Sequence, residues 1–523
     1  MEQTQILSGR QQEELHKAIL QYLENILKDD DSQILAKLRK KFDIPSDKQD
    51  EEVIPNYLEK KWSTVLRLQK RVYELQKELN NLRSIFDSQG SNVWNGSSAN
   101  KSRADWLPHL NMKTFMTKSD QLIQCVAIHP VLPIIMAGCS DGSLIIWNLS
   151  NDEQSIPDKI IKAHTRPITK ISWSKYPVDL QDNYTKNEPV ARHYICASAS
   201  SDLTIKIWEG GNFKQLRTLT GHEHTISSLC FSASKPGILY SVSRDMSTKV
   251  WNLSNGFCVK TFVGHSEWVR DIDSISRNEA LLPYNEPPSS GLGDFLLTCS
   301  NDQSIRLSHA ESGTGLALLI GHTHVIECVK FLPQHSNHFI DNYLKENTSL
   351  FTNLSLDIIN DTRYEKELGY KYCISGGRDN SIKLWLLPLP VLRAQRHPLP
   401  SQINNSHGWL VAELNGHKSW VKSLAVHPNG RFVFSCSDDK EIRIWDLQTL
   451  PKYESVRCTE VLKGHEGFVT DISFAGYDRS TINVPVDHDG SDYDYTKQLE
   501  YLEKKIRCLF ISGAMDSTVR LWS

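Results

Sequence analysis

Residues 241–251 read Ser-Val-Ser-Arg-Asp-Met-Ser-Thr-Lys-Val-Trp, and residues 260–270 read Lys-Thr-Phe-Val-Gly-His-Ser-Glu-Trp-Val-Arg. The first stretch alternates apolar and polar residues around Arg244-Asp245, which predicts two strands joined by a tight turn. The second stretch predicts a connecting strand that ends at Gly264-His265. Together they define a small antiparallel unit, and the same unit recurs along the chain.

Two markers of this unit repeat with regular spacing. A small residue followed by histidine occurs at Ala163-His164, Gly221-His222, Gly264-His265, Gly321-His322, Gly416-His417 and Gly464-His465. The turn aspartates are Asp141, Asp202, Asp245, Asp302, Asp379, Asp439 and Asp516. Tryptophan stands six positions after each of them, except after Asp302, where Ser308 takes its place. Seven turns predict seven small sheets, which bury their faces by closing into a ring.

The repeat resembles the WD40 repeat from about residue 107 to the last residue. The resemblance implies an all-β, seven-bladed propeller over residues 107–523. It also implies a hydrogen-bonded set within each blade, made of the histidine, a strand serine such as Ser243, the turn aspartate and the tryptophan. We therefore predict that the repeat histidines are structural, not metal ligands or bases. Ser308 predicts a weaker fourth blade.

Closure of the ring requires an outer strand for the seventh sheet, because the sequence ends at Ser523, directly after Trp522. Residues 113–116 align with residues 260–263, although Thr117-Lys118 follows them instead of Gly-His. We expect residues 110–116 to supply the missing strand. The two ends of the propeller would then be held together.

The first 45 residues predict two short helices. Apolar residues fall on one face of the first helix, and Asp31 or Ser32 caps the second. Such a small pair exposes apolar surface that a second copy would cover. Residues 14–23, Glu-Leu-His-Lys-Ala-Ile-Leu-Gln-Tyr-Leu, resemble a LisH dimerisation motif, although the turn departs from its usual pattern. The dimer contacts implied are Leu15, Ile19, Tyr22 and Leu23.

Residues 55–88 predict a coiled coil. Its heptad seam contains Val65, Leu68, Val72, Leu75, Leu79 and Leu82, with charged residues on both sides. A lone amphipathic helix packed on the propeller is the alternative. Residues 89–106 include a run rich in Ser, Asn and Gly, which predicts a flexible linker.

Composition limits the possible functions. The net charge of −3 predicts no general attraction to nucleic acid, and no apolar run is long enough for membrane insertion. The 11 cysteines include no Cys-x-x-Cys pair, as expected for a reducing cytosol. No P-loop, Gly-x-Ser-x-Gly or His-Glu-x-x-His motif occurs, so we predict neither an enzyme nor a bound cofactor or metal.

The long insertions identify the working face of the ring. They lie at 176–192, 281–293, 333–369, 387–408 and 476–504, in connections that emerge on one face of a propeller. The other face, built from the Gly-His loops and the aspartate turns, carries no long insertion. Beside those loops stand Arg244, Trp268, Arg270, Arg378, Trp420 and Lys440, with Lys422 nearby.

These side chains predict a protein-binding surface, because Trp and Arg dominate protein–protein hot spots. The positive charge favours an acidic partner surface. The alternative for any single residue is packing between blades, or pairing with Glu267 or Glu441.

The order of segments points to one family. The sequence Leu58–Leu75, with Gly-His-Ser-Glu-Trp-Val-Arg and Ser-Asp-Asp-Lys-Glu-Ile-Arg-Ile-Trp-Asp, resembles the lissencephaly/nuclear-distribution family of dynein regulators, in a divergent fungal form. The resemblance implies a homodimer whose propeller binds the cytoplasmic dynein heavy chain through positions matching Arg244, Arg270, Arg378, Trp420 and Lys440. It also implies a NudE-type coiled-coil adaptor, microtubule plus-end partners, a cytoplasmic and cytoskeletal location that includes spindle poles, and a role in nuclear migration and spindle positioning.

Two other functions fit the same segments. LisH and WD40 parts also occur in scaffolds of ubiquitin ligases and corepressors, although those chains usually carry further segments between them. Animal relatives of the family also serve as the non-catalytic subunit of a lipid acetylhydrolase. Copurification with dynein heavy chain, a ligase module or a hydrolase would separate the three.

Overall fold

The computed structural model describes most of residues 107–522 and a few residues before them. The described ranges are 16–17, 19–20, 23, 32–42, 71, 107–108, 111–117, 121–149, 156–178, 193–276, 293–347, 350–351, 354–393, 396–401, 407–450, 458–474 and 509–522. The chain divides into two compact units, Met1–Ser102 and Arg103–Ser523. In the first unit, α2 (Ser32–Lys41) begins where the sequence places a helix cap.

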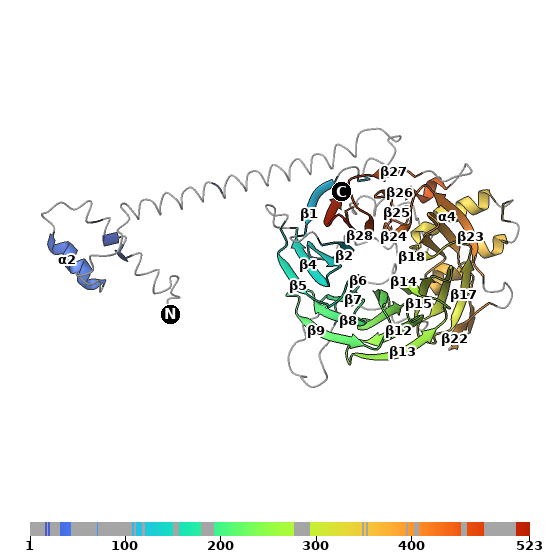
Figure 1. Cartoon of the computed structure of the whole chain (residues 1–523), viewed down its shortest axis with the longest axis horizontal. Helices are drawn as coiled ribbons and strands as arrows, with labels where there is room; N and C mark the ends of the chain where they lie inside the picture. Colours follow the sequence, from blue (N-terminus) through green and yellow to red (C-terminus); the bar gives the residue numbers. More distant parts are fainter. Residues whose placement is uncertain are drawn as a thin grey trace, which may run out of the picture. The chain divides into compact units, whose positions relative to one another are not determined.

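The strands described in the second unit form seven four-stranded antiparallel sheets, the blades of a propeller, and one two-stranded hairpin (Figure 1). Blade 1 contains β2 (Ile123–Ile128), β3 (Ile134–Cys139), β4 (Ser143–Asn148) and β5 (Lys159–Lys162). Blade 2 contains β6 (Ile168–Trp173), β7 (Ile195–Ser200), β8 (Thr204–Glu209) and β9 (Gln215–Thr220). Blade 3 contains β10 (Ile226–Phe231), β11 (Ile238–Ser243), β12 (Ser247–Asn252) and β13 (Phe257–Val263).

The remaining blades follow the same plan. Blade 4 contains β14 (Val269–Ser276), β15 (Asp294–Ser300), β16 (Ser304–His309) and β17 (Gly315–Ile320). Blade 5 contains β18 (Ile326–Phe331), β19 (Tyr372–Gly377), β20 (Ser381–Leu386) and β23 (Trp409–Asn415). Blade 6 contains β24 (Val421–Val426), β25 (Phe432–Ser437), β26 (Ile442–Asp446) and β27 (Glu460–Leu462). Blade 7 contains β28 (Val469–Phe474), β29 (Phe510–Ala514), β30 (Thr518–Trp522) and β1 (Asn111–Met116).

The ring closes as the sequence predicts. Strand β1 pairs antiparallel with β30, with Met116 opposite Thr518 and Asn111 opposite Trp522. A second latch lies nearer the channel, where Asp471 of blade 7 accepts the backbone N–H of Val126 in blade 1 at 3.2 Å. Asp471 also receives the Lys170 ammonium at 2.9 Å and the Ser423 hydroxyl at 2.8 Å. One buried carboxylate therefore joins four blades.

The insertions fall in the connections that the sequence assigned to them. The 333–369 segment between β18 and β19 contains α4 (His335–Glu346), α5 (Leu356–Ile359) and the short π-helical turn η4 (Tyr364–Leu368). The 387–408 segment between β20 and β23 contains the hairpin of β21 (Val391–Arg393) and β22 (Arg396–Leu399). A 3₁₀ turn, η5 (Leu447–Thr449), follows β26.

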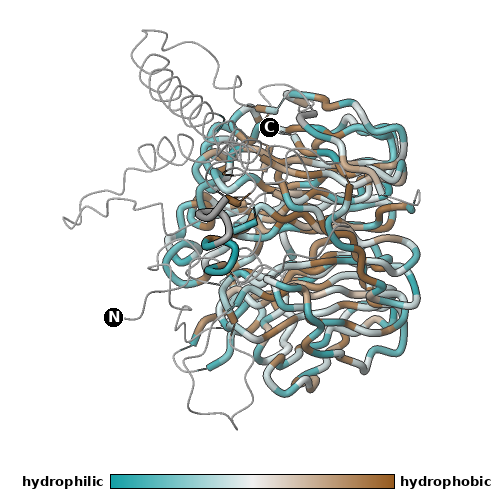
Figure 2. The backbone as a smooth tube through the Cα atoms, turned by 90° about the vertical axis from the view of Figure 1, so that its left-hand side faces the viewer, coloured by the Kyte–Doolittle hydropathy of each residue, from teal (hydrophilic) through white to brown (hydrophobic). Residues whose placement is uncertain are grey.

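The second strand of each blade is almost entirely buried. Its hydrophobic side chains therefore fill the interior of the blade. Figure 2 shows hydrophobic stretches running through the middle of the ring, with hydrophilic turns toward its two faces. This distribution leaves the turns free to present polar and charged groups.

The predicted hydrogen-bonded set is present in blades 2, 3, 5, 6 and 7, with one correction. In blade 1, Thr117 follows the outer strand where the other blades have histidine, and the Trp147 indole N–H has no hydrogen-bond partner among the described residues. In blade 3, His222 bonds Asp245 at 2.7 Å and Ser241 at 2.7 Å, and the Trp251 indole N–H donates to Ser241 at 2.8 Å. The serine is therefore Ser241, and the choice of Ser243 was wrong. The Ser243 hydroxyl instead donates to the Thr225 carbonyl at 2.9 Å and receives the Asp245 N–H at 3.1 Å. The strand period explains the error, because 241 and 243 lie on the same face.

Blades 2, 5, 6 and 7 repeat this set through His164, His322, His417 and His465. Steric crowding by the tryptophan explains why a glycine precedes the histidine. A Cβ on Gly321 would lie 2.8 Å from the ring of Trp385. The repeat histidines are structural, as predicted.

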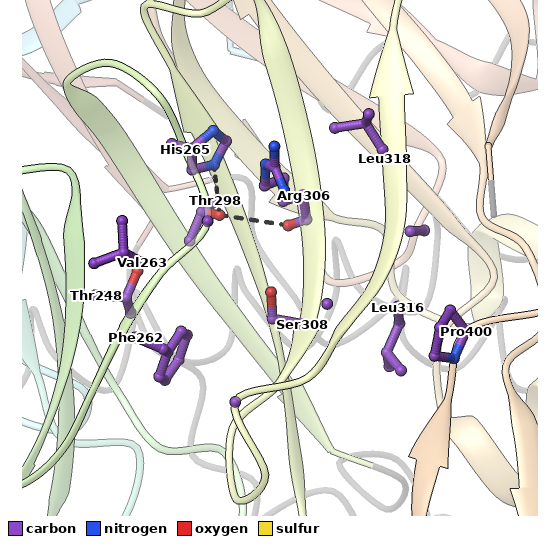
Figure 3. Close-up of a pocket in the computed structure, with 14 residues that line it drawn as sticks. Thr248, Phe262, Val263, His265, Thr298, Arg306, Ser308, Leu316, Leu318 and Pro400 are labelled. Carbon is purple, nitrogen blue, oxygen red and sulfur yellow. Dashed lines mark hydrogen bonds between the residues drawn. The ribbon is translucent and has the colours of Figure 1, made fainter.

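Blade 4 keeps the histidine and aspartate but lacks the indole. His265 bonds Asp302 at 2.9 Å and Thr298 at 3.0 Å, while Ser308 occupies the tryptophan position. A cavity of about 300 Å³ opens there, between Phe262 of blade 3 and the outer strands of blade 4 (Figure 3). The cavity is consistent with a weaker fourth blade, which stays a prediction.

Candidate functional site

The candidate site is a ring of side chains that we call the turn rim. It comprises the residue before each turn aspartate, the residue before each blade's first strand, and the second residue of that strand. The first two positions are linked in every blade by one backbone hydrogen bond. The N–H of Arg244 donates to Thr225, that of Asn301 to Trp268, that of Arg378 to Val325, and that of Asp438 to Trp420, at 2.8–3.0 Å. Because the bond repeats, these side chains emerge around the same end of the ring.

One cluster of the turn rim centres on Trp268. The guanidinium of Arg244, from blade 3, lies 4.7 Å from the indole centroid, and that of Arg270 lies 5.7 Å from it. Arg270 also donates its Nε–H to the Asn301 side-chain oxygen at 2.6 Å. Trp268 keeps 36% of its surface exposed. The indole is therefore fixed by two cations and still accessible.

A second cluster centres on Trp420. Arg378, from blade 5, lies 4.2 Å from the indole centroid, and the Lys422 ammonium lies 5.2 Å from it. Trp420 is 38% exposed. Each cation–aromatic contact of this kind contributes about 0.5–1 kcal/mol when exposed and more when water is excluded.

Glu327, the second residue of β18, joins the two clusters. Its carboxylate lies 4.0 Å from the Arg270 guanidinium and 3.9 Å from the Lys422 ammonium, and it accepts the Nε–H of Arg378. Burial alone would raise the pKa of Glu327, but Lys422, Arg270 and Arg378 lower it below its ordinary value. Burial, with repulsion from Arg378 and Arg244, lowers the pKa of Arg270. One partly buried anion thus holds three cations of three blades in place.

This arrangement suits binding more than catalysis. It offers two half-exposed indoles and a net positive charge, because the four cations of the two clusters outnumber the carboxylates of Glu327 and Asp438. Aromatic and arginine groups held in place before contact lose little side-chain entropy on association. A surface with acidic groups and a shallow apolar patch would complement it.

Five of the six predicted site residues come together in these clusters, namely Arg244, Trp268, Arg270, Arg378 and Trp420. Lys440 lies in the β25–β26 turn, where it is exposed and adopts a φ of 70°. Among the described residues its side chain contacts neither cluster. Glu441 pairs instead with Arg443 at 2.8 Å and Lys463 at 3.3 Å.

Sequence reasoning missed Glu327 and Asn301. The signal was available in the repeat, since Glu327 occupies the same strand position as Arg270 and Lys422, and Asn301 the same turn position as Arg244 and Arg378. A search for cations and indoles alone passes over the groups that orient them.

Most residues predicted for dimer formation lie outside the described part of the chain: Leu15, Tyr22, Val65, Leu68, Val72, Leu75, Leu79 and Leu82. Ile19 and Leu23 are described as half-buried helical residues. The LisH motif over residues 1–45, the coiled coil over residues 55–88 and the linker over residues 89–106 therefore stay predictions. No helix in the described ranges is long and apolar enough to cross a bilayer.

The fold and the turn rim define the class of this protein as a seven-bladed WD40 propeller. The family model "WD domain, G-beta repeat" matches residues 111–148, 213–252, 256–307, 408–446 and 497–523. The chain is 60% identical to nuclear distribution protein PAC1 of Debaryomyces hansenii, over 100% of both chains. It is 47% identical to that of Candida albicans over 100% of both, and 38% identical to that of Komagataella phaffii over 99% of this chain and 97% of the relative.

The chain therefore belongs to the nuclear distribution protein PAC1 family. This confirms the family resemblance read from the sequence. Family membership also supports the prediction of a non-catalytic protein.

Proposed function

We propose that this protein is a non-catalytic regulator of cytoplasmic dynein, acting as a dimer whose turn rim binds the motor domain of the heavy chain. The observation that carries the proposal is the pair of cation-bound indoles, Trp268 and Trp420, joined through Glu327 on one rim of a PAC1-family propeller. Through this contact it would control motor activity and recruit the motor to microtubule plus ends, for nuclear migration and spindle positioning.

The mechanism requires no bond to be made or broken. A bound propeller can shift a motor between two conformations only if it binds one of them more tightly. The turn rim suits that task because its indoles and guanidinium groups are already oriented. An acidic motor surface that presents its charges in one conformation would be selected by the same clusters.

Dimer formation would strengthen this contact. A second propeller held nearby raises apparent affinity by roughly 10²–10⁴ when both can engage. Residues 1–88 are proposed to hold the two copies together, and the coiled coil offers a surface for a NudE-type adaptor. These contacts would place the protein in the cytoplasm, on microtubule plus ends and spindle poles.

The test is co-sedimentation of purified motor domain with wild-type protein and with Arg244→Ala, Arg378→Ala and Trp420→Ala. Each substitution should weaken binding by about tenfold or more, as hot-spot residues do. Lys159→Ala is the matched control, because the Lys159 ammonium lies 5.9 Å from the Phe213 ring, in a cation–aromatic pair away from the turn rim. Unchanged binding by the three variants would refute the site.

Two further measurements separate the parts of the proposal. A truncation lacking residues 1–88 should be monomeric by light scattering, and a dimeric truncation would remove the helical-dimer account. Copurification from lysate should recover dynein heavy chain. Recovery of a ubiquitin-ligase module or a lipid acetylhydrolase in its place would favour the alternative functions.

A further inference from the structure

The hairpin β21–β22 brings a second group of polar side chains against blade 4, away from the turn rim. It is inserted in blade 5 between β20 and β23, yet β22 contacts β17 of blade 4. His407, farther along the same insertion, forms a parallel bridge with Leu318 of β17. Pro400, which follows β22, lines the cavity beside Ser308. The hairpin therefore covers the blade that lacks its tryptophan.

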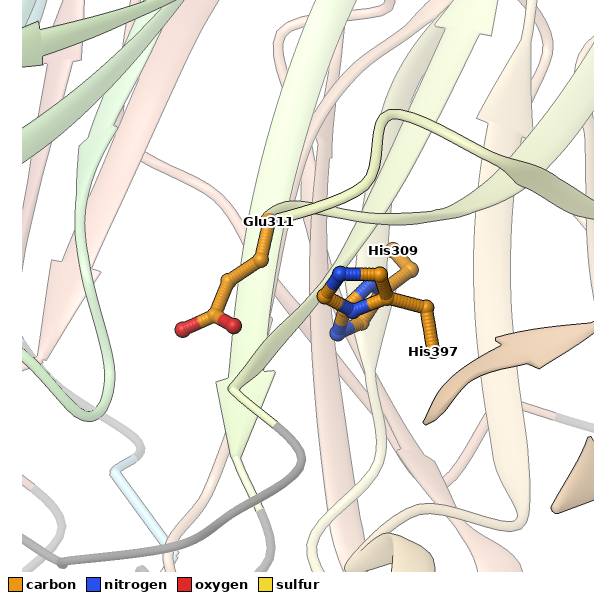
Figure 4. Close-up of side chains that lie close together, drawn as sticks. All are labelled: His309, Glu311 and His397. Carbon is orange, nitrogen blue, oxygen red and sulfur yellow. The ribbon is translucent and has the colours of Figure 1, made fainter. Parts of the chain in front are cut away.

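Three potential metal ligands meet at this contact. His309 ends β16, Glu311 lies in the β16–β17 turn, and His397 lies on β22. One ligand atom from each lies within 4.8 Å of the other two. The two imidazole rings lie with their centroids 5.3 Å apart, and Figure 4 shows the Glu311 carboxylate on one side of them.

His309 is the fixed member of the group. It is fully buried, and its Nδ1 lies 2.9 Å from the Ser312 hydroxyl and 3.2 Å from the Ser312 N–H, which donates to it. Since Ser312 lies against Nδ1, a metal would bind through Nε2. Metal binding would require the other tautomer, in which Nδ1–H donates to the Ser312 hydroxyl oxygen and the bond from the Ser312 N–H to Nδ1 is given up. A metal-bound histidine usually has its other ring nitrogen bonded to an oxygen in this way.

The other two ligands are exposed and can adjust. Bonds of about 2.0–2.2 Å in a tetrahedral site place ligand atoms about 3.3 Å apart. Rotation of His397 and Glu311 about their side-chain bonds can supply that approach, because both are exposed. Pairing with Lys235 is the main reason that the pKa of Glu311 lies below its ordinary value, so the carboxylate is ionised at neutral pH.

We propose that His309, Glu311 and His397 form a site for a divalent transition metal, best met by Zn²⁺, with water as the fourth ligand. Two imidazoles and one carboxylate are ligands that Zn²⁺ accepts readily. The metal joins the blade 5 hairpin to the edge of blade 4, and so stabilises the blade in which Ser308 replaces tryptophan.

Lys235 competes with the metal for the same carboxylate. Its ammonium donates to Glu311 Oε1. The Lys260 ammonium donates to the Glu311 backbone carbonyl instead of the carboxylate. Removal of the Lys235 charge should therefore tighten metal binding.

The experiment measures Zn²⁺ binding calorimetrically on the chelator-treated full-length protein, in a Cys258→Ser background because Cys258 is the exposed thiol among the cysteines described. Wild type should bind one ion, and His397→Ala or Glu311→Gln should weaken binding at least tenfold. Lys235→Met should tighten it several-fold. His193→Ala is the matched control, because His193 lies 4.0 Å from Glu209 in an exposed pair without a third ligand nearby in the described residues. That variant should bind as wild type does.

A second readout reports on the hairpin. Saturating Zn²⁺ should raise the melting temperature of wild type by about 2 °C or more. It should leave His397→Ala unchanged. Absence of one-ion binding at micromolar to 100 µM Zn²⁺, or binding that His397→Ala and Glu311→Gln do not alter, overturns the proposal.

Discussion

The guanidinium of Arg378 lies over the indole of Trp420, 4.2 Å from the ring centroid, although the two residues belong to different blades. Arg378 precedes the turn aspartate of blade 5, and Trp420 precedes the first strand of blade 6. Packing between blades therefore fixes the geometry of this cation–indole pair, and the turn rim depends on correct closure of the ring.

Arg378→Lys tests whether this stacking matters beyond charge. Lysine keeps the positive charge but loses the planar group that stacks on the ring and donates to Glu327. We expect the affinity for the dynein motor domain to fall about three- to tenfold, measured by fluorescence titration. Lys422→Arg is the control, because its ammonium makes the longer contact of 5.2 Å and either cation can supply it. Equal affinities for wild type and Arg378→Lys would show that Arg378 acts through its positive charge alone.

Glu327→Gln tests the group that joins the clusters. The substitution keeps the shape but removes the anion that contacts Arg270, Arg378 and Lys422, so these three cations repel one another more strongly. Asp438 remains as a carboxylate near Arg378 and Lys422. We expect the free energy of unfolding to fall by about 1–3 kcal/mol in urea titrations at pH 7.

The control for this change is Glu311→Gln in the metal-free protein. Glu311 pairs with Lys235, and their side chains are 35% and 56% exposed. A pair of this kind contributes about 0–1 kcal/mol. If both variants lowered the free energy of unfolding by the same small amount, Glu327 would not have the central role assigned to it.

Much of this architecture could be read from the sequence because the repeat fixes it many times over. The aspartate–tryptophan spacing predicted seven sheets, and the alignment of residues 113–116 with 260–263 predicted the β1–β30 latch. The contacts within the site were less accessible. Glu327 of blade 5 contacts Arg270 of blade 4 and Lys422 of blade 6, so only the closed ring brings these groups together. Asn301 acts within blade 4, where the strand pairing places it beside Arg270.

The error at Ser243 has a related cause. Both Ser241 and Ser243 are buried on the same face of β11, and only the reach of the Trp251 indole decides between them. Lys440 follows its turn aspartate instead of preceding it, and its part in binding stays a prediction.

Ser308→Trp should repair blade 4. An indole at this position would fill part of the cavity of about 300 Å³, and Thr298 would offer the oxygen that serine offers in the other blades. In blade 6, Trp445 donates to Ser435 at 2.9 Å beside Arg443, which corresponds to Arg306 here. We expect the free energy of unfolding to rise by about 1 kcal/mol or more.

Ser308→Ala is the control for the repair and should change stability by less than about 0.5 kcal/mol. Thermal and urea unfolding of the two variants against wild type give the comparison. A Trp variant less stable than the Ala variant would mean that the space cannot admit the ring, and that blade 4 has adapted to its absence.

His427 should make stability depend on pH between about 4 and 6.5. Burial lowers its pKa to about 4, and its Nδ1 accepts the Asn429 N–H at 3.3 Å. The unfolded chain takes up the proton near pH 6.5 while the folded chain does not, so stability is full above pH 6.5 and falls as pH drops toward 4. The slope from one such histidine is at most about 1.4 kcal/mol per pH unit.

Urea unfolding at pH 7, 6, 5 and 4.5 measures this slope, and His427→Gln should reduce it because glutamine does not titrate. His129, whose pKa burial also lowers to about 4, contributes in the same window and should leave a residual slope. The turn aspartates act at lower pH, because their depressed pKa values, about 2 for Asp439, stabilise the fold above pH 3.8 and lose that effect as pH falls. His193→Gln, an exposed histidine, should keep the wild-type slope. A His427→Gln slope identical to that of wild type would show that His427 is protonated in the folded chain, against the burial that isolates it.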